Sequence, residues 1–179
     1  MSSNIEIKAY YPNLEKAHTI AIGLGAKPSL SQYQRDTYFR VASGRLKLRE
    51  IPDAAWLIPY IRPNDLSAKR SDYEVIDIAN PSHTREMLAQ MLGISVVVEK
   101  HREIYLLENV RIHLDNVTDL GCFIEFEAVF DPGDPSAEKV NRIKVQQLME
   151  DFEIDASLLI SDSYHDLLLR KLKAHSVGA

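Results

Sequence analysis

The chain has 179 residues, of which 45% are hydrophobic and 26% are charged. This composition is typical of a globular protein and excludes a disordered or fibrous chain, and the length predicts a single domain over residues 1–179. The chain has 21 lysine and arginine residues against 26 aspartate and glutamate residues, which gives a net charge of −5. A nucleic-acid polymer is therefore not expected as a partner.

The first residues and the cysteine content predict a cytoplasmic location. Residues 1–8 show neither the basic start nor the apolar stretch of a secretory signal. Cys122 is the only cysteine, which excludes an internal disulfide. No apolar run approaches the ~18 residues of a membrane-spanning helix, so no membrane contact is expected. The sequence leaves the oligomeric state open, with a dimer among the alternatives.

Apolar periodicity and turn residues divide the chain into strands and helices. In chain order, they predict a strand over 4–10, a helix over 14–24, strands over 32–41, 45–51, 56–62 and 71–78, a helix over 82–92, strands over 95–107, 110–116 and 122–130, and helices over 136–150 and 163–172. Most strands follow one another directly through short turns. The sheet is therefore expected to be antiparallel, and the fold class is α+β with the helices packed on the outside.

Charged side chains recur at alternate positions of these strands, which places them on one face of each strand. The clearest pairs are Glu6/Lys8, Lys47/Arg49, Lys100/Arg102 and Glu125/Glu127. One interpretation is an ordinary sheet with one face in water. The alternative is that the helices cover the apolar faces, so that the charged faces meet inside a closed or nearly closed eight-stranded β-barrel. The density of charge on nearly every strand favours the barrel.

The interior of such a barrel would be rich in both kinds of charge. The cations are Lys8, Lys47, Arg49, Arg62, Arg70, Lys100, Arg102 and Arg111, and the acids are Glu6, Asp72, Glu74, Asp115, Glu125 and Glu127. Buried charges need partners, either one another or a ligand. Arginine and lysine bind phosphate oxygens, and clustered carboxylates bind hard divalent cations. The pattern therefore predicts a small polyanion, such as a phosphate chain, together with a divalent cation.

Seven motifs follow one another along the chain in a familiar order. They are Glu6–Lys8, Gln34–Phe39, Leu46–Arg49, Tyr60–Pro63, Val98–Arg102, His113–Val117 and Leu120–Glu127. This succession resembles the CYTH superfamily of triphosphate tunnel enzymes, and within it the branch of class IV adenylyl cyclases. The resemblance runs from Ile5 to about Leu168. It implies an antiparallel eight-stranded tunnel that binds a triphosphate and one or two Mg²⁺ or Mn²⁺ ions.

The resemblance also implies a role for individual residues. The metal ligands would be Glu6, Asp115, Glu125 and Glu127, and the phosphate ligands would be Lys8, Lys47, Arg49, Arg62, Lys100, Arg102 and Arg111. Glu6 and Lys8 would act in catalysis. The family signature begins with Glu-x-Glu-x-Lys, whereas this chain has Asn4 at the first position. The first carboxylate of the motif is therefore missing.

Three functions are compatible with such a tunnel. The residues of the motifs favour an adenylyl cyclase-like reaction, which converts ATP to cyclic AMP and pyrophosphate. The first alternative is a triphosphatase that acts on thiamine triphosphate or inorganic triphosphate. The second is a catalytically weakened triphosphate- or nucleotide-binding protein, an interpretation that Asn4 motivates. All three need the same phosphate site, so the sequence does not separate them.

Overall fold

One antiparallel sheet forms the framework of the protein. The computed structural model describes residues 3–61, 72–131, 133 and 136–177. The strands are β1 (Ser3–Tyr10), β2 (Lys27–Phe39), β3 (Arg45–Ile51), β4 (Ala54–Ile61), β5 (Asp72–Tyr73), β6 (Ile76–Asp77), β7 (Ile94–Leu107), β8 (Val110–Val117) and β9 (Gly121–Phe130). They pair in the order β1-β9-β8-β7-β2-β3-β4-β5, and β6 pairs with β4 beside β5.

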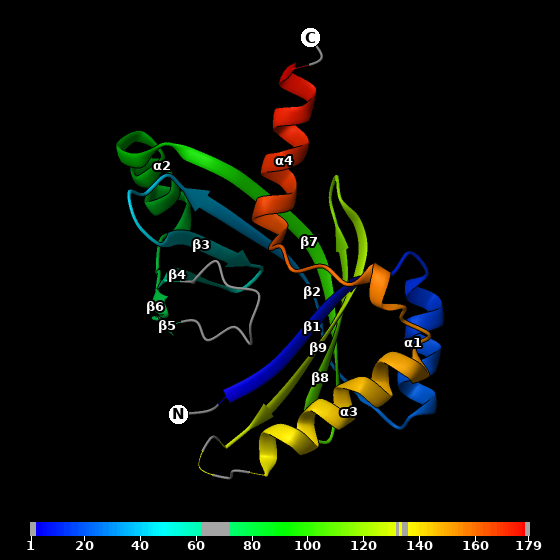
Figure 1. Cartoon of the computed structure of the whole chain (residues 1–179). Helices are drawn as coiled ribbons and strands as arrows, with labels where there is room; N and C mark the ends of the chain where they lie inside the picture. Colours follow the sequence, from blue (N-terminus) through cyan, green and yellow to red (C-terminus); the bar gives the residue numbers. More distant parts are fainter. Residues whose placement is uncertain (1–2, 62–71, 132, 134–135, 178–179) are drawn as a thin grey trace.

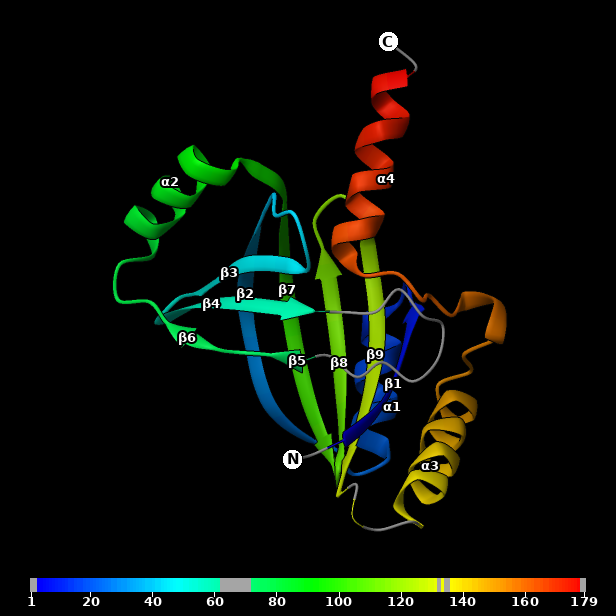
Figure 2. The same cartoon turned by 60° about the vertical axis from the view of Figure 1, so that its left-hand side comes forward.

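The sheet curls into a barrel that is nearly closed (Figures 1 and 2). Strand β1 forms one edge, and the short strands β5 and β6 share the other edge along β4. Among the residues that the structure describes, no backbone pairing joins these two edges. The predicted α+β fold is confirmed, with eight strands along the path of the antiparallel sheet. A closed and a nearly closed barrel were both predicted, and the protein adopts the nearly closed form.

Three helices cover the convex, outer face of the sheet. They are α1 (Leu14–Gly23), α2 (Pro81–Leu92) and α3 (Ala137–Asp151). Ile112 and Phe126 of the sheet belong to one buried cluster with Ala21 of α1 and Val145 of α3. On the other side, α2 packs over β2 and β3 through a second cluster, which contains Leu48 and Leu88. The predicted outer packing is confirmed for these three helices. None of the described helices is long and apolar enough to span a membrane.

Local signals in the sequence explain where α1 and α2 begin and end. The side chains of Asn13 and Asn80 cap the two helices by accepting hydrogen bonds from backbone amides of their first turns, and Pro81 opens α2. Gly25 and Gly93 follow the two helices with φ values of 83° and 75°. This left-handed conformation suits glycine and stops a helix, which is why both ends lie close to their predicted positions.

The C-terminal helix α4 (Tyr164–Val177), preceded by the 3₁₀ turn η1 (Ala156–Leu158), packs on the concave, inner face. Tyr164 and Leu168 lie in one buried cluster with Val98, Val117 and Phe123. Strand alternation puts these three on the same face as the inner charges. The prediction that all helices pack outside is therefore wrong for α4, because one end of the inner face is apolar and offers the helix a partner. The distal part of α4 projects beyond the sheet (Figures 1 and 2).

The packing of the outer face gives a stability prediction. Ile112 is fully buried on β8, and removing one methylene from such a site leaves a small cavity. We expect Ile112→Val to lower the free energy of unfolding by about 1 kcal/mol in urea denaturation. The control is Ile143→Val on α3, where the side chain is 61% exposed and the same change should have almost no effect. Equal losses at the two positions would contradict the outer core described here.

Candidate functional site

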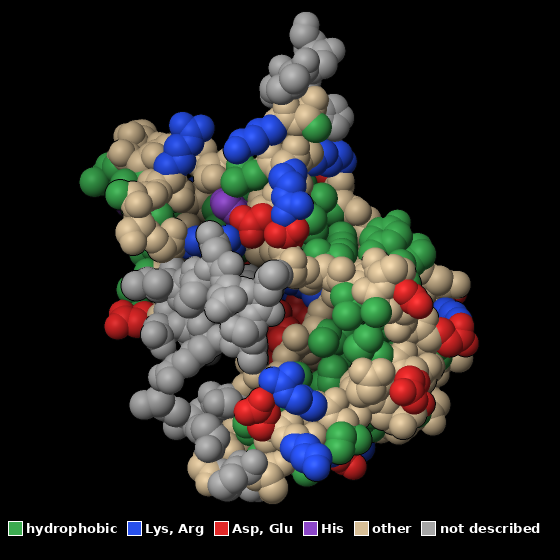
Figure 3. All heavy atoms as spheres, in the orientation of Figure 1, with side chains coloured by type: hydrophobic (Ala, Val, Ile, Leu, Met, Phe, Trp, Pro, Cys, Tyr) green, Lys and Arg blue, Asp and Glu red, His purple; other side chains and the backbone are tan. Residues whose placement is uncertain are grey.

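The strand register brings the predicted charged residues onto one continuous surface, the inner face of the sheet. Residues directly opposite each other in an antiparallel pair point to the same side. Lys8 lies opposite Glu125 on β1 and β9, and Arg102 lies opposite Asp115 on β7 and β8. In the view of Figure 3, acidic and basic side chains are visible in a recess in the middle of the molecule. The charges thus form a ladder across neighbouring strands.

Asp36 of β2 is the centre of the first group of charges. Arg49 donates to both carboxylate oxygens of Asp36, from Nε to Oδ1 and from Nη2 to Oδ2, each at 2.7 Å. Lys47 Nζ donates to Oδ2 at 3.1 Å. Sequence reasoning missed Asp36 as a site residue, because its alternate neighbours Gln34 and Tyr38 carry no charge. Its position in the Gln34–Phe39 motif was the available signal.

Asp115 of β8 is the centre of the second group and is only 1% exposed. Arg102 Nε donates to Oδ1 and Arg102 Nη2 to Oδ2, both at 2.6 Å. The Tyr164 hydroxyl of α4 donates to Oδ2 at 2.7 Å, and Lys100 Nζ lies 3.9 Å from the same oxygen. Both oxygens of Asp115, a predicted metal ligand, therefore already bind protein donors.

Glu125 of β9 links the second group to the first strand. One of its carboxylate oxygens lies 3.6 Å from Lys8 Nζ and 3.7 Å from Arg102 Nη2, and the other lies 3.5 Å from Nδ1 of His113. Lys8 Nζ also lies 4.6 Å from the centroid of the Tyr164 ring. Lys8, Arg102 and Glu125, all predicted from the sequence, are thus brought into one contact group at the first turn of α4.

Glu6, Glu127 and Arg111 gather farther from α4, towards the start of β1. Glu127 accepts a hydrogen bond from Asn4 Nδ2 at 2.9 Å and one from Arg111 Nη1 at 3.2 Å. Glu6 lies directly opposite Glu127 in the β1–β9 register. The Arg111 side chain is 53% exposed, so this group borders solvent. The remaining predicted phosphate ligand, Arg62, lies outside the described residues.

Burial changes the protonation of the two inner lysines. It lowers the pKa of Lys47 to about 8, although the attraction of Asp36 offsets part of the shift. Burial, together with the repulsion of Arg102, lowers the pKa of Lys100 to about 7. A charged ammonium group loses its hydration in such a place, so burial shifts each lysine towards its neutral form. At pH 8, Lys100 is therefore mostly neutral.

The inner carboxylates behave in the opposite way. Burial alone would raise the pKa of Asp36, but Lys47 and Arg49 outweigh it and hold the pKa well below its ordinary value. The same balance, with Lys100 and Arg102 as the cations, lowers the pKa of Asp115 to about 2. Lys8 and His113 hold the pKa of Glu125 well below its usual range against the effect of burial. These carboxylates therefore remain ionised at neutral pH.

The oxygen ligands for a divalent cation do not form a complete cage. Among the described residues, no group of three or more histidine, cysteine, aspartate or glutamate side chains could hold a metal ion. The opposed carboxylates of Glu6 and Glu127 are nevertheless the hard oxygen ligands that Mg²⁺ prefers, and Mg²⁺ is commonly held by one or two carboxylates plus substrate phosphates. The ring nitrogens of the buried His113 lie 3.5 Å from Glu125 and 4.0 Å from Glu127. The residues therefore fit an ion shared between protein and phosphate.

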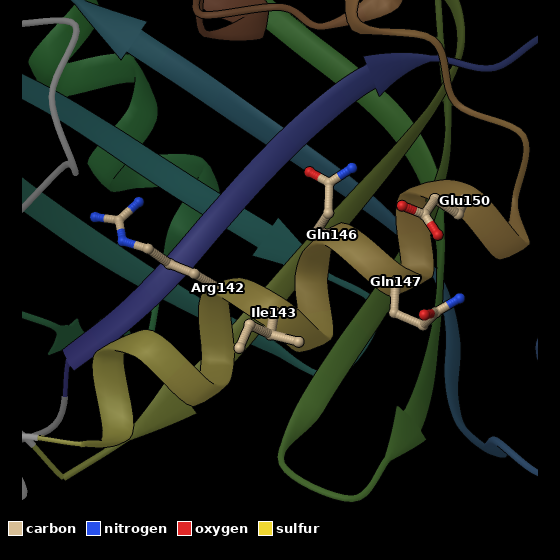
Figure 4. A pocket seen from close by; sticks show the side chains of 5 residues that line it. All are labelled: Arg142, Ile143, Gln146, Gln147 and Glu150. Carbon is tan, nitrogen blue, oxygen red and sulfur yellow. The ribbon is translucent and has the colours of Figure 1, made fainter.

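A separate hollow runs along α3 on the outer side of the protein. Figure 4 shows the side chains that line it, which are Arg142, Ile143, Gln146, Gln147 and Glu150. Helix α3 covers the convex face, so this hollow has no part in the inner charged face. Its lining contains one arginine and one glutamate rather than a cluster of charges. The candidate site is therefore the inner face of the sheet.

Comparison with known proteins supports this choice at the level of the family. The family model of the CYTH domain matches residues 2–164, which is most of the chain. The match therefore includes every residue of the candidate site named above, and Tyr164 is its last residue. Comparison with curated proteins finds no match.

Solved structures show the same fold. The PH1012 protein of Pyrococcus horikoshii OT3 has a TM-score of 0.78 and 22% identity, over 92% of this chain and 98% of that one. A candidate adenylate cyclase from Vibrio parahaemolyticus has a TM-score of 0.72 and 19% identity, over 93% and 97% of the two chains. HpAC1 from Hippeastrum, a candidate adenylyl cyclase described as having a dominant triphosphatase activity, has a TM-score of 0.66 and 15% identity, over 96% of each chain.

Proposed function

Since the chain belongs to the CYTH domain family, we propose that the inner face of its sheet binds the triphosphate group of a nucleotide or of another small molecule and converts it. The observation that supports this most directly is the ladder of partly or fully buried cations. Arg49, Arg102 and Lys8 lie on three different strands and face one space. Arginine forks and lysine ammonium groups on a concave surface match the spaced oxygens of a phosphate chain.

We assign Glu6 and Glu127 to hold a Mg²⁺ or Mn²⁺ ion between the protein and the phosphate chain. When bound, such an ion supplies neutralisation of phosphate charge and polarisation of a phosphoryl oxygen. The protein's own residues do the remaining work. Lys8, Arg49 and Arg102 fix the phosphate oxygens and stabilise the charge that develops during phosphoryl transfer, while Lys47 and Lys100 add charge as they take up protons.

Two reactions can follow from this binding mode. In the adenylyl cyclase-like reaction, which the motifs favour, the ribose 3′-hydroxyl attacks the α-phosphorus and pyrophosphate leaves. In the triphosphatase reaction, water attacks the terminal phosphorus and orthophosphate leaves. The described charges of the inner face suit the phosphate chain whatever group carries it, so they are compatible with both reactions.

A product analysis separates the three candidate functions. The purified protein is incubated with ATP, thiamine triphosphate or inorganic triphosphate, each with Mg²⁺ or Mn²⁺. Cyclic AMP from ATP identifies the cyclase, and released orthophosphate identifies the triphosphatase. Tight binding without turnover identifies a binding protein, which is the outcome that the missing carboxylate at Asn4 would explain. Absence of both binding and turnover for all three compounds would contradict the proposed function.

The depressed lysine pKa values give a prediction about protons. A bound triphosphate raises the pKa of Lys47 and Lys100 from about 8 and about 7, so both lysines gain protons on binding. At pH 8 the phosphates of ATP are already ionised, so the uptake there comes from the protein. We expect net proton uptake at pH 8 and much less at pH 6, where both lysines are already charged.

Calorimetry of ATP binding in two buffers of different ionisation enthalpy measures this uptake. Lys100→Met should reduce the uptake at pH 8, because it removes the group that is most fully neutral before binding. Proton release at pH 8, or an uptake that does not change between pH 6 and pH 8, would show that the lysines are not buried as the structure has them.

A further inference from the structure

Two buried carboxylates, Asp36 and Asp115, occupy equivalent places in the charged ladder. Each lies on one strand and binds an arginine of the adjacent strand through two parallel hydrogen bonds of 2.6–2.7 Å. Each also has a lysine near its Oδ2, which is Lys47 for Asp36 and Lys100 for Asp115. We call these two residues the carboxylate anchors. The similarity is unexpected, because the sequence assigned Asp115 to a metal and gave Asp36 no role.

Geometry argues against a metal at either anchor. A carboxylate oxygen that accepts two hydrogen bonds has both lone pairs occupied, which is the case for Oδ2 of each anchor but for neither oxygen of Glu127. Both oxygens of Asp115 accept short hydrogen bonds from Arg102, and Oδ2 accepts a third from Tyr164. Both oxygens of Asp36 are bound by Arg49, and Oδ2 also by Lys47. Binding an ion there would displace an arginine that the phosphate chain needs.

The anchors instead fix the direction of flexible side chains. A free arginine has many rotamers, and holding it in one of them costs conformational entropy when a ligand binds. A guanidinium group held by two parallel hydrogen bonds presents its remaining N–H donors in one direction before the ligand arrives. Tyr164 extends this arrangement to α4, because its hydroxyl holds Asp115 in turn.

We propose that Asp36 and Asp115 are positioning residues of the triphosphate site, which hold Arg49 and Arg102 in their phosphate-binding orientation, and that Tyr164 of α4 completes the anchor at Asp115. This inference rests on the proposed function and deepens it. It makes the inner end of the C-terminal helix part of the binding site, and it leaves Glu6 and Glu127 as the residues that hold the ion.

Removing an anchor carboxylate changes anion binding in opposite directions, depending on whether its charge or its positioning role dominates. Removing a negative charge from an anion-binding site should tighten anion binding if charge alone matters. If the anchors position the arginines, Asp36→Asn and Asp115→Asn should weaken the binding of tripolyphosphate, measured by calorimetry in EDTA, by about tenfold or more. Tyr164→Phe should weaken it in the same direction by a smaller factor. Glu99→Gln is the matched control, because it removes one charge from the outer face of β7 beside Lys100.

The outcomes distinguish a failure of the positioning role from a failure of the proposed function. If wild type binds tripolyphosphate neither in EDTA nor with Mn²⁺, the proposed function fails. If wild type binds and both asparagine variants bind equally well or more tightly, the positioning role is overturned. The factor by which Mn²⁺ tightens tripolyphosphate binding should be unchanged in Asp115→Asn, and its loss with unchanged metal-free binding would make Asp115 a metal ligand instead.

An asparagine at a buried ion pair can unfold the protein, so a variant that keeps the charge is needed as a control. Asp36→Glu keeps the charge and moves the carboxylate by one methylene. Circular dichroism establishes that each variant is folded. Weakened tripolyphosphate binding by folded Asp36→Glu and Tyr164→Phe supports positioning, and wild-type binding by both overturns it.

Discussion

Arg102→Ala is expected to weaken tripolyphosphate binding by about 100-fold or more, the largest loss among single substitutions on the inner face. Arg102 contacts two of the inner carboxylates. It binds Asp115 through two hydrogen bonds and lies 3.7 Å from Glu125, and its own exposure is only 9%. Its remaining donors act in a poorly hydrated space, where each charge-assisted hydrogen bond to phosphate is strong. Calorimetry at fixed ionic strength measures the loss.

The same substitution should also reduce stability. Without Arg102, the carboxylate of Asp115 loses the partner that binds both of its oxygens, and breaking a buried ion pair costs about 3–5 kcal/mol. Arg102→Lys keeps the charge and should recover stability better than affinity, because lysine cannot form the two-pronged contact. The control is Arg35→Ala, which removes an arginine from the outer face of β2. Wild-type affinity in folded Arg102→Ala would show that phosphate binds elsewhere.

Asn4→Glu is expected to strengthen the response to Mn²⁺ at least tenfold, in both metal affinity and turnover. Asn4 and Glu6 lie on the inner face of β1, and Asn4 donates a hydrogen bond to Glu127. A glutamate at position 4 adds a third carboxylate beside the pair that we assign to the ion, and hard divalent cations bind anionic oxygens more tightly than amide oxygens. Without metal, the added charge should lower stability through repulsion of Glu127.

Titration with Mn²⁺, followed by turnover of ATP and inorganic triphosphate, measures the change. Asn116→Glu is the matched control, because it makes the same exchange at an exposed position on the outer face of β8. The two variants should differ sharply in their dependence on Mn²⁺. If neither wild type nor Asn4→Glu responds to the metal, the assignment of Glu6 and Glu127 is wrong and the binding-protein alternative stands.

Alternation of charge along the strands predicted four residues that share the inner face, although Glu74, which the same rule placed among the inner acids, is exposed. Lys8, Arg49, Arg102 and Glu125 lie on the inner face because side chains of a strand point to opposite sides in turn, a rule that needs only the sequence. The same rule could not show which acid binds which base. The contact of Arg102 with Asp115 depends on the β7–β8 register, which is set by the turn and by packing across the sheet.

Two features could not be predicted from the sequence, for identifiable physical reasons. Asp36 lies between uncharged alternate neighbours, so no pair of charges marked it as an inner residue. The packing of α4 was assigned to the wrong face because helical periodicity shows that a helix has an apolar side but not which surface that side covers. The inner positions Val98 and Phe123 continue the same alternation as the charged residues, and they are apolar at the end where α4 packs.

The pairing of β1 with β9 has a consequence for how the protein is made. Asn4 contacts Glu127, so β1 is synthesised well before its partner, which lies 123 residues later in the chain. Contacts over such sequence distances form late, because long loops must close first. During synthesis, β1 is thus an exposed strand, and unpaired strands invite aggregation. Glu6 and Lys8, placed at alternate positions of that strand, would discourage association between nascent chains long before they meet a triphosphate.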